Sequence, residues 1–261
     1  MSRLHLLEIH DQDWCPPSLR DGLTRCINSF VFLMRPYRPV ADLLVPGLTQ
    51  TADEHVVDLC SGSGGPWPFL AHRVQSRLEK AGRPPVSVTL TDKFPAAETQ
   101  TLPEGVSYLS ESIDATNITP EQAKGFRTLF TSFHHFKPET ATALLADAVK
   151  NKQGIAIFEF TRRHPLAILS FLIVPMFIPL ALLFMKKRCW RDWLWTLPIP
   201  ILPLTVLFDG VVSCLRTYSP KECLQLAKDA DPDGLFEWQS GIESGLPAGM
   251  TYLIGIPKAA S

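Results

Sequence analysis

The stretch that decides the fold runs from Val56 to Trp67 and reads VVDLCSGSGGPW. It begins as a short apolar run, passes through a glycine-rich turn and leads into a segment with helical spacing from Phe69 to Ala81. Glycines in such a turn let the backbone bend sharply and let a ligand approach the main chain closely. A glycine-rich turn between a strand and a helix is typical of folds that bind nucleotides.

Further strands and helices alternate after this turn. The sequence predicts strands over 86–90, 106–109, 128–131 and 155–160, with a helix over 139–150. A helix beginning at the Ser219 N-cap and ending near Ala230 is followed by two more strands, over 235–243 and 250–256. The alternation of strands and helices predicts a Rossmann-like α/β fold with a mostly parallel sheet. The last two strands are predicted to form an antiparallel hairpin.

The composition excludes several classes of protein. With 261 residues, 46% of them hydrophobic and 20% charged, the chain suits one large α/β domain and little disorder. The formal net charge of −1 shows no excess of basic residues, so no nucleic-acid partner is expected. The six cysteines form no CxxC pair and none lies near a histidine at ligand spacing. We therefore predict no metal site, reduced cysteines and a cytoplasmic protein.

Two acids follow the second and third predicted strands. Asp92 comes at the end of the strand that reads TLTD, where a carboxylate can accept hydrogen bonds from both hydroxyls of a ribose. Asp114 lies in SIDAT, after the next strand, where it can bind an adenine amino group. A single such Asp is more often a turn or cap residue, but two in strand order favour a nucleoside ligand.

These motifs resemble those of the class I S-adenosylmethionine-dependent methyltransferases. The resemblance covers most of residues 55–160 and the segment 215–257, and its motifs are VVDLCSGSGG, TLTD, SIDAT and LFTSFHHF. It implies S-adenosylmethionine as the cofactor and the antiparallel hairpin at the end of the sheet. It also implies that Asp58 fixes the glycine-rich turn near the methionine end of the cofactor, and that Gly62 and Gly64 pack against the cofactor. Asp92 matches the family's ribose-binding acid and Asp114 its adenine-side acid.

Five neighbouring residues complete the predicted cofactor site. They lie in or directly beside the same motifs: Cys60, Ser61, Lys93, Ala115 and Ser132. The sequence departs from the family's pattern at Pro66-Trp67, directly after the glycines, which puts the geometry of the turn in doubt. The same Trp67 stands where a dinucleotide fingerprint counted from Gly62 requires Gly or Ala. An NAD(P)-dependent oxidoreductase is therefore a weaker alternative, and a non-catalytic, membrane-associated nucleoside-binding scaffold is the other.

The candidate catalytic residues follow the fourth and fifth predicted strands. His134 and His135 are expected beside the methyl donor, where either can act as a general base. His135 is the favoured one, because it lies further into the loop. Glu159 is a second candidate, or a structural carboxylate paired with Arg162 or Arg163. Methyl transfer from a sulfonium needs orientation more than it needs a base, so these histidines can also simply shape the pocket.

The segment 161–208 does not belong to the minimal sheet. Residues 166–185 are almost continuously apolar, basic and Trp residues follow over 186–195, and a second apolar run with three prolines occupies 197–208. Two membrane crossings are disfavoured because the second run is short and broken by prolines, and because the basic residues would have to cross. Asp209-Gly210, directly after this run, is predicted to form a turn. Two interpretations stay open: a monotopic membrane insertion, and an apolar lid over the acceptor.

The predicted organisation is an N-terminal helical cap over 1–50 and a methyltransferase domain over 51–261 that carries this insertion. The predicted function is methyl transfer from S-adenosylmethionine to a small apolar acceptor, in a cytoplasmic protein with peripheral membrane contact through 166–208. Arg216 is expected to form an ion pair within the domain or to reach an anionic group of the acceptor. The oligomeric state and the acceptor atom stay open.

Overall fold

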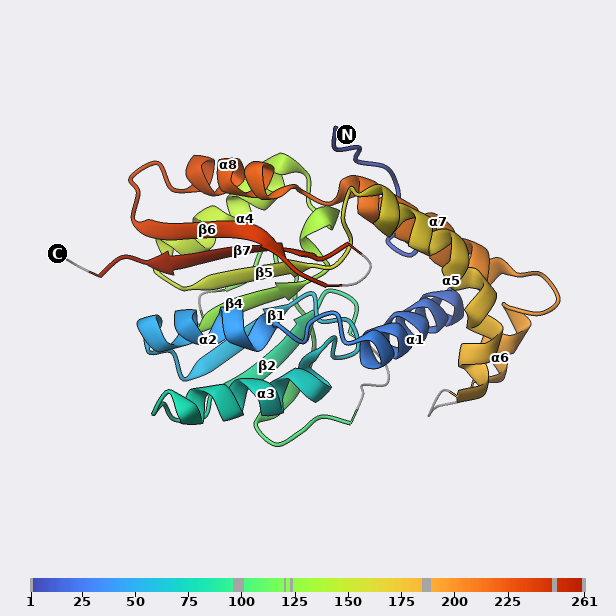
Figure 1. Cartoon of the computed structure of the whole chain (residues 1–261), viewed down its shortest axis with the longest axis horizontal. Coiled ribbons are helices and arrows are strands. Elements are labelled where there is room, and N and C mark those ends of the chain that lie inside the picture. The colour runs from blue at the N-terminus through green and yellow to red at the C-terminus, as the bar shows by residue number, and fades with distance from the viewer. Residues whose placement is uncertain are drawn as a thin grey trace.

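The protein is described by a computed structural model that covers residues 2–95, 101–119, 121–122, 124–184, 189–245 and 248–259. Its centre is a seven-stranded sheet in the order β3-β2-β1-β4-β5-β7-β6 (Figure 1). The strands are β1 (His55–Leu59), β2 (Ser87–Asp92), β3 (Val106–Ser112), β4 (Phe126–Phe130), β5 (Ile155–Glu159), β6 (Phe236–Glu243) and β7 (Met250–Pro257).

The sheet confirms the predicted Rossmann-like class. Strands β1 to β5 pair in parallel, whereas β7 runs antiparallel to both β5 and β6. From β1 the chain builds outward to β2 and β3 on one side, and then to β4 and β5 on the other. The strand order therefore reverses between β1 and β4, and in open α/β sheets ligands bind at the carboxyl ends of the strands at this position.

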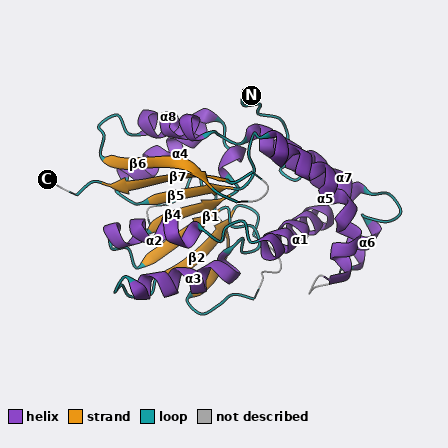
Figure 2. Ribbon diagram, in the orientation of Figure 1, coloured by secondary structure: helices purple, strands orange, loops and turns teal. Residues whose placement is uncertain are grey.

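Helices cover both faces of the sheet (Figures 1 and 2). On one face lie α2 (Val40–Thr51) and α3 (Trp67–Lys80), and on the other lie α4 (Pro138–Lys150) and α8 (Pro220–Ala230). Alternation along β1 divides the core between the faces, since Val56 packs with α2 and α3 while Val57 packs with α4 and α8. The Ser219 side chain and Glu222 form a complete capping box at the start of α8, as Ser219 predicted.

The remaining helices form a separate layer beside the carboxyl ends of β1 and β4 (Figure 1). They are α1 (Pro17–Met34), α5 (Pro165–Phe184), α6 (Trp190–Leu194) and α7 (Ile201–Arg216), and we call them the helical layer. Leu19 and Leu23 of α1 share an apolar cluster with Ile178 and Leu182 of α5. The predicted cap of residues 1–50 is thus divided: α1 packs on the insertion, whereas α2 packs on the sheet.

The structure corrects two expectations in the insertion. Asp209-Gly210, predicted as a turn, lies inside α7, which continues from Ile201 to Arg216 without a break. The prolines of the second apolar run do not interrupt a helix, because Pro198 and Pro200 precede α7 and Pro203 stands in its first turn. A proline there loses no hydrogen bond, since the first backbone N–H groups of a helix have no partner within it. The basic residues 186–188 lie outside the described residues.

Gly210 lies where α7 packs directly against α5. A Cβ on Gly210 would overlap the ring of Phe171 on α5. We expect Gly210→Val to lower the free energy of unfolding by about 1–3 kcal/mol, because an overpacked helix contact forces the ring and the backbone apart. Urea unfolding measures it, with Gly245→Ala as the control, because a Cβ at Gly245 meets only ordinary contact distances. Equal losses in the two variants would contradict the contact.

Candidate active site

The glycine-rich turn leaves β1 with an unusual backbone. Cys60, Gly62 and Gly65 have φ values of 58°, 58° and 50°, and Gly64 has a φ of 123°. The turn is held to β2 by a hydrogen bond of 2.9 Å from the Ser61 N–H to the Thr91 carbonyl oxygen. A Cβ on Gly62 would meet no atom within 4 Å, so the side of the backbone that glycine leaves bare faces open space. This face of the turn is therefore available to a ligand.

Asp58 lies behind this turn and is fully buried. Its Oδ1 accepts a hydrogen bond of 2.6 Å from the Thr128 hydroxyl on β4, and its Oδ2 accepts one of 2.6 Å from the Ser61 hydroxyl. Burial raises the pKa of Asp58 to about 7, although these hydrogen bonds lower it. The carboxyl group thus connects β1, β4 and the turn.

Asp92 closes the other side of the turn. Its Oδ2 accepts a hydrogen bond of 2.7 Å from the Gly62 N–H, and its Oδ1 accepts one of 2.7 Å from the Phe94 N–H. Burial raises the pKa of Asp92, and the two backbone hydrogen bonds oppose that shift. Each carboxylate oxygen has a second lone pair, so both can still accept a hydrogen bond from a ligand hydroxyl.

Asp114 lies next to Asp92 at the same edge of the sheet. The Ile113 N–H donates to the Asp92 carbonyl oxygen at 2.9 Å, which brings the two predicted acids together. Lys93 Nζ lies 2.8 Å from Asp114 Oδ2, and this contact lowers the pKa of Asp114 to about 2. The Thr116 N–H and hydroxyl both donate to Asp114 Oδ1, at 3.0 and 2.7 Å. The local turn therefore fixes this carboxylate, as well as placing it beside the predicted ribose acid.

The predicted histidines are the last two residues of a one-turn helix, η1 (Phe133–His135). This helix follows β4 and the buried Ser132. His134 Nδ1 lies 2.6 Å from Glu159 Oε2, and Glu159 Oε1 accepts a hydrogen bond of 2.7 Å from the Phe133 N–H. Burial raises the pKa of Glu159, but the charge and hydrogen bond of His134 outweigh it, so the pKa lies below its usual value. Glu159 thus holds η1 at the end of β5.

The expected pairing of Glu159 with Arg162 or Arg163 is wrong. Arg163 instead pairs with Glu222 of α8, and Arg162 donates to the Ala248 carbonyl oxygen. The reason is the direction of β5: Glu159 is the last strand residue and faces η1, while the chain turns away after it toward α5. Arg216, by contrast, forms the ion pair that was one of its two predicted roles, as described next.

An N-terminal segment that the sequence did not single out completes the site. His135 Nδ1 lies 2.8 Å from Asp11 Oδ2, and Arg216 Nη1 lies 3.1 Å from Glu8 Oε1 and 3.2 Å from Asp11 Oδ2. Glu8 is fully buried, and this burial raises its pKa. Burial lowers the pKa of the His135 imidazole. No motif marked Glu8 or Asp11, because an acid between Leu7 and Ile9 in an irregular segment has no periodic signal.

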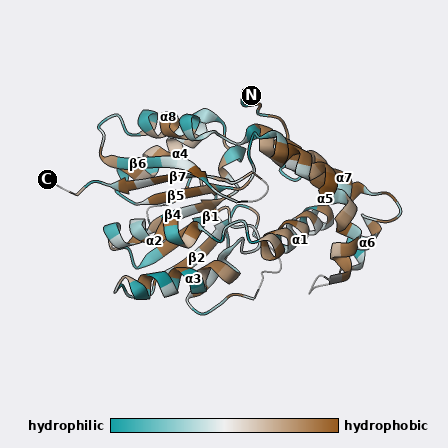
Figure 3. Ribbon diagram, in the orientation of Figure 1, coloured by the Kyte–Doolittle hydropathy of each residue, from teal (hydrophilic) through white to brown (hydrophobic). Residues whose placement is uncertain are grey.

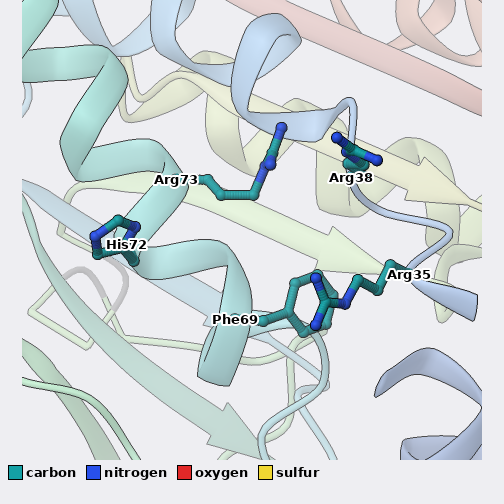
Figure 4. A pocket seen from close by; sticks show the side chains of 5 residues that line it. All are labelled: Arg35, Arg38, Phe69, His72 and Arg73. Carbon is teal, nitrogen blue, oxygen red and sulfur yellow. The ribbon is translucent and has the colours of Figure 1, made fainter. Parts of the chain in front are cut away.

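Two cavities lie near the surface of the described part of the chain. One of about 310 Å³ is lined by Arg35, Arg38, Phe69, His72 and Arg73, between α3 and the α1–α2 connection (Figure 4). None of the predicted site residues lines it. A second, of about 280 Å³, is lined by Glu8, Asp11, Arg216 and neighbouring residues of the N-terminal segment. No residue of η1 lines this second cavity, but Glu8 and Asp11, which do, lie close to His134 and His135.

Comparison with known proteins gives likenesses of fold alone. No known family model matches the sequence, and no curated protein is detectably similar to it. The LepI structure in complex with SAM is 16% identical over 78% of this chain and 42% of that chain, with a TM-score of 0.44. An O-methyltransferase family protein from Burkholderia thailandensis is 15% identical over 87% of this chain and 57% of that chain, also at 0.44.

A third similar structure is described as a Zn-dependent alcohol dehydrogenase from Rhodobacter sphaeroides. It is 14% identical over 93% of this chain and 98% of that chain, with a TM-score of 0.48. This chain spans only 42% of the length of LepI and 57% of the length of the Burkholderia protein. Because the sequence identities are 14–16% and the TM-scores are below 0.5, the function follows from this chain's own residues alone. The fold is defined by the strand order of the sheet.

The buried Asp58 makes stability depend on pH. The pKa of Asp58 is raised from 3.8 to about 7, so between these values the folded protein holds a proton that the unfolded chain releases. The contribution of this group to the free energy of unfolding is therefore full below about pH 4 and is lost as the pH rises to about 7. We expect Asp58→Asn to remove this loss, so that the difference between variant and wild type changes across this range. Urea unfolding at a series of pH values measures it, and parallel curves would contradict the shift.

Proposed function

We propose that the chain binds S-adenosylmethionine at the glycine-rich turn and transfers its methyl group to a hydrophobic acceptor. The observation that carries the proposal is the Asp92 carboxylate, which is held against the Gly62 N–H at the topological switch point of the sheet. The free lone pairs of Asp92 suit two ribose hydroxyls, and the bare face of Gly62 leaves room for the nucleoside.

The other predicted cofactor residues support the same placement. Asp114 and Ala115 lie at the edge where an adenine would follow a ribose on Asp92. Asp58, Cys60 and Ser61 form the floor of the turn on the other side, where the resemblance to class I methyltransferases expects the methionine end. The methyl group would then lie toward Ser132 and η1, at the carboxyl end of β4.

A dinucleotide is supported less well. Trp67 is fully buried, and its ring meets the ring of Phe130 edge-on, with 6.0 Å between centroids. The first turn of α3 is therefore kept apart from the sheet by a large ring, at the position where a dinucleotide fingerprint uses Gly or Ala for close packing. This packing favours S-adenosylmethionine over NAD(P).

His134 and His135 are proposed to face the acceptor. Glu159 holds the Nδ1 side of the His134 ring and Asp11 holds that of the His135 ring, so both imidazoles are fixed with Nε2 on the side of Glu8. A fixed imidazole can take a proton from an acceptor during methyl transfer. Orientation of the acceptor by these rings is the second contribution, because an in-line approach to the sulfonium is needed in either case.

The helical layer supports an apolar acceptor and membrane contact. One side of α5 exposes a stripe of large apolar side chains along its whole length: Leu166, Leu169, Leu172, Ile173, Met176, Phe177, Leu180 and Leu183. Figure 3 shows how strongly apolar α5 and α7 are. Trp190 at the start of α6 is 69% exposed as well, and in the sequence it lies among the basic residues over 186–191. Exposed apolar stripes beside Trp and basic residues suit the headgroup region of a bilayer.

We propose that this stripe lies on the surface of a membrane, on its cytoplasmic side, rather than crossing it. Length and composition alone make Pro165–Leu183 long enough for a span, or two spans if the bent pair α7 and α8 counted as one. However, Asp209 accepts hydrogen bonds from the Ile9 and His10 N–H groups, and Arg216 pairs with Glu8. These contacts hold α7 against the site, so α7 does not serve as the return crossing that α5 would need.

The cofactor proposal predicts binding of S-adenosylmethionine and S-adenosylhomocysteine in the micromolar range, without binding of NADH. We expect Asp92→Ala to weaken both affinities about 10- to 100-fold, because the hydrogen bonds of a charged group are lost. Titration calorimetry measures this, with Asp229→Ala on the exposed end of α8 as the control. Unchanged affinity in Asp92→Ala would refute the ribose assignment, and binding of NADH alone would refute the cofactor.

The membrane proposal predicts that the protein sediments with vesicles containing anionic lipid. Met176 lies in the middle of the stripe and is 77% exposed. We expect Met176→Glu to reduce vesicle binding about tenfold or more, because the apolar contact is replaced by a charge that resists burial. Leu235→Glu, at an exposed apolar residue before β6, is the control and should bind as the wild type does. A protein that ignores vesicles and instead sediments as a dimer would show that a second copy covers the stripe.

A further inference from the structure

Three side chains at η1 and in the N-terminal segment bring possible metal-ligand atoms close together. His134 Nε2 lies 3.6 Å from Glu8 Oε1, and His135 Nε2 lies 3.9 Å from Glu8 Oε2. The ligand atoms of Glu8, His134 and His135 all lie within 4.8 Å of one another. The three residues come from the N-terminal segment and from the end of β4, so only the folded chain brings them together.

The other nitrogen of each imidazole is already bound to a carboxylate. His134 Nδ1 lies 2.6 Å from Glu159 Oε2, and His135 Nδ1 lies 2.8 Å from Asp11 Oδ2. A carboxylate accepts hydrogen bonds, so in both rings Nδ1 carries the hydrogen, and in the neutral imidazole Nε2 then carries the lone pair. Carboxylates that hold Nδ1 in this way orient the histidine ligands of metal ions and raise their basicity.

Three of the converging atoms, both carboxylate oxygens of Glu8 and His134 Nε2, have no hydrogen bond among the described residues, although Glu8 is 0% and His134 1% exposed. Glu8 Oε1 has an ion-pair partner in Arg216, whereas no described ion pair neutralises the charge on the side of the two imidazoles other than that of the histidines themselves. The separations of 3.6 and 3.9 Å are too long for hydrogen bonds. They are close to the separation of about 3.4 Å between two ligands of a tetrahedral ion with bonds of about 2.1 Å.

The charge around these atoms also favours a cation. Arg216 lies 3.1 Å from Glu8 Oε1 and 3.2 Å from Asp11 Oδ2, so one guanidinium is shared by two carboxylates. Glu159 adds a third acid, bound to His134. With both imidazoles neutral, the negative charge exceeds the positive charge of these groups. The cavity of about 280 Å³ that Glu8, Asp11 and Arg216 line reaches the Glu8 side of this group.

We propose that Glu8, His134 and His135 bind one divalent transition-metal ion. Two imidazoles and one carboxylate form a ligand set that suits Zn²⁺ and neighbouring ions such as Co²⁺, and it leaves at least one coordination position open. A second group, His10, Asp11 and His135, is less suitable because His135 Nδ1 and Asp11 are already hydrogen-bonded to each other. The open position would bind an oxygen or nitrogen of the acceptor, and only that consequence rests on the proposed function.

The test uses the full chain after removal of metals with a chelator. Titration with Co²⁺ is followed by its visible absorption, and Zn²⁺ then competes for the same site. We expect one Co²⁺ per chain with the intense absorption of four-coordinate cobalt. Because loss of an outer carboxylate alone typically costs 10- to 100-fold in affinity, we expect loss of a ligand in Glu8→Gln or His134→Gln to cost about 100-fold or more.

The controls separate this site from others. His72→Gln changes an exposed histidine of α3 and should bind Co²⁺ as the wild type does. Thermal unfolding without metal shows which variants fold. If His134→Gln does not fold, the Co²⁺ affinities of Glu8→Gln and His135→Gln test the proposal. Equal Co²⁺ affinity in wild type and Glu8→Gln, or binding that His72→Gln abolishes, would overturn the proposal. The titration contains no S-adenosylmethionine, so its outcome is independent of cofactor binding.

Discussion

The fold around the candidate site depends on one buried carboxyl group, that of Asp58. It accepts hydrogen bonds from Thr128 on β4 and from Ser61 in the glycine-rich turn, so it joins the two strands between which the strand order reverses. A buried polar group with its partners satisfied fixes a single arrangement, because any other would leave it unpaired. The glycine-rich turn then places the Gly62 N–H where it donates a hydrogen bond to Asp92. The position of the predicted ribose acid therefore follows from the position of Asp58.

Local patterns were sufficient to predict the strands of the sheet and the helices α3, α4 and α8, whereas α2 was expected in the N-terminal cap. The run VVDL, the glycine-rich turn and the capping residue Ser219 each specify their structure within a few residues, and all lie in the predicted elements. The helical layer was less predictable. Asp209-Gly210 looks like a turn by residue type, yet Gly210 sits inside α7 because the Phe171 ring of α5 needs the space that glycine leaves. The helix tolerates Asp209 because the carboxylate accepts hydrogen bonds from the Ile9 and His10 N–H groups. Both reasons are tertiary contacts, which no local pattern contains.

The candidate site shows the same division. Asp58, Gly62, Asp92 and Asp114 follow strands in order, and the parallel sheet brings their positions to one edge. Glu8 and Asp11 belong to no regular element and reach His134 and His135 across more than a hundred residues of chain. The expectation of no metal site rested on cysteine spacing, a signal that applies to ligands close in sequence. The proposed ligand set, divided between the N-terminal segment and the end of β4, has no such spacing.

The helix α7 links the two unusual features of the molecule. On one side it carries Asp209 and Arg216, which are buried against the N-terminal segment and hold Glu8 and Asp11 in place. On the other side it exposes Leu204 and Phe208, and it packs along α5 with its apolar stripe. If the stripe lies on a membrane, α7 fixes the distance between the polar site and the lipid surface. It can do so because one side of this rigid helix contacts the N-terminal segment and the helix also packs along α5. An acceptor with an apolar body and a polar end would then fit this layer better than one that is apolar throughout, since its two parts would meet surfaces of their own kind.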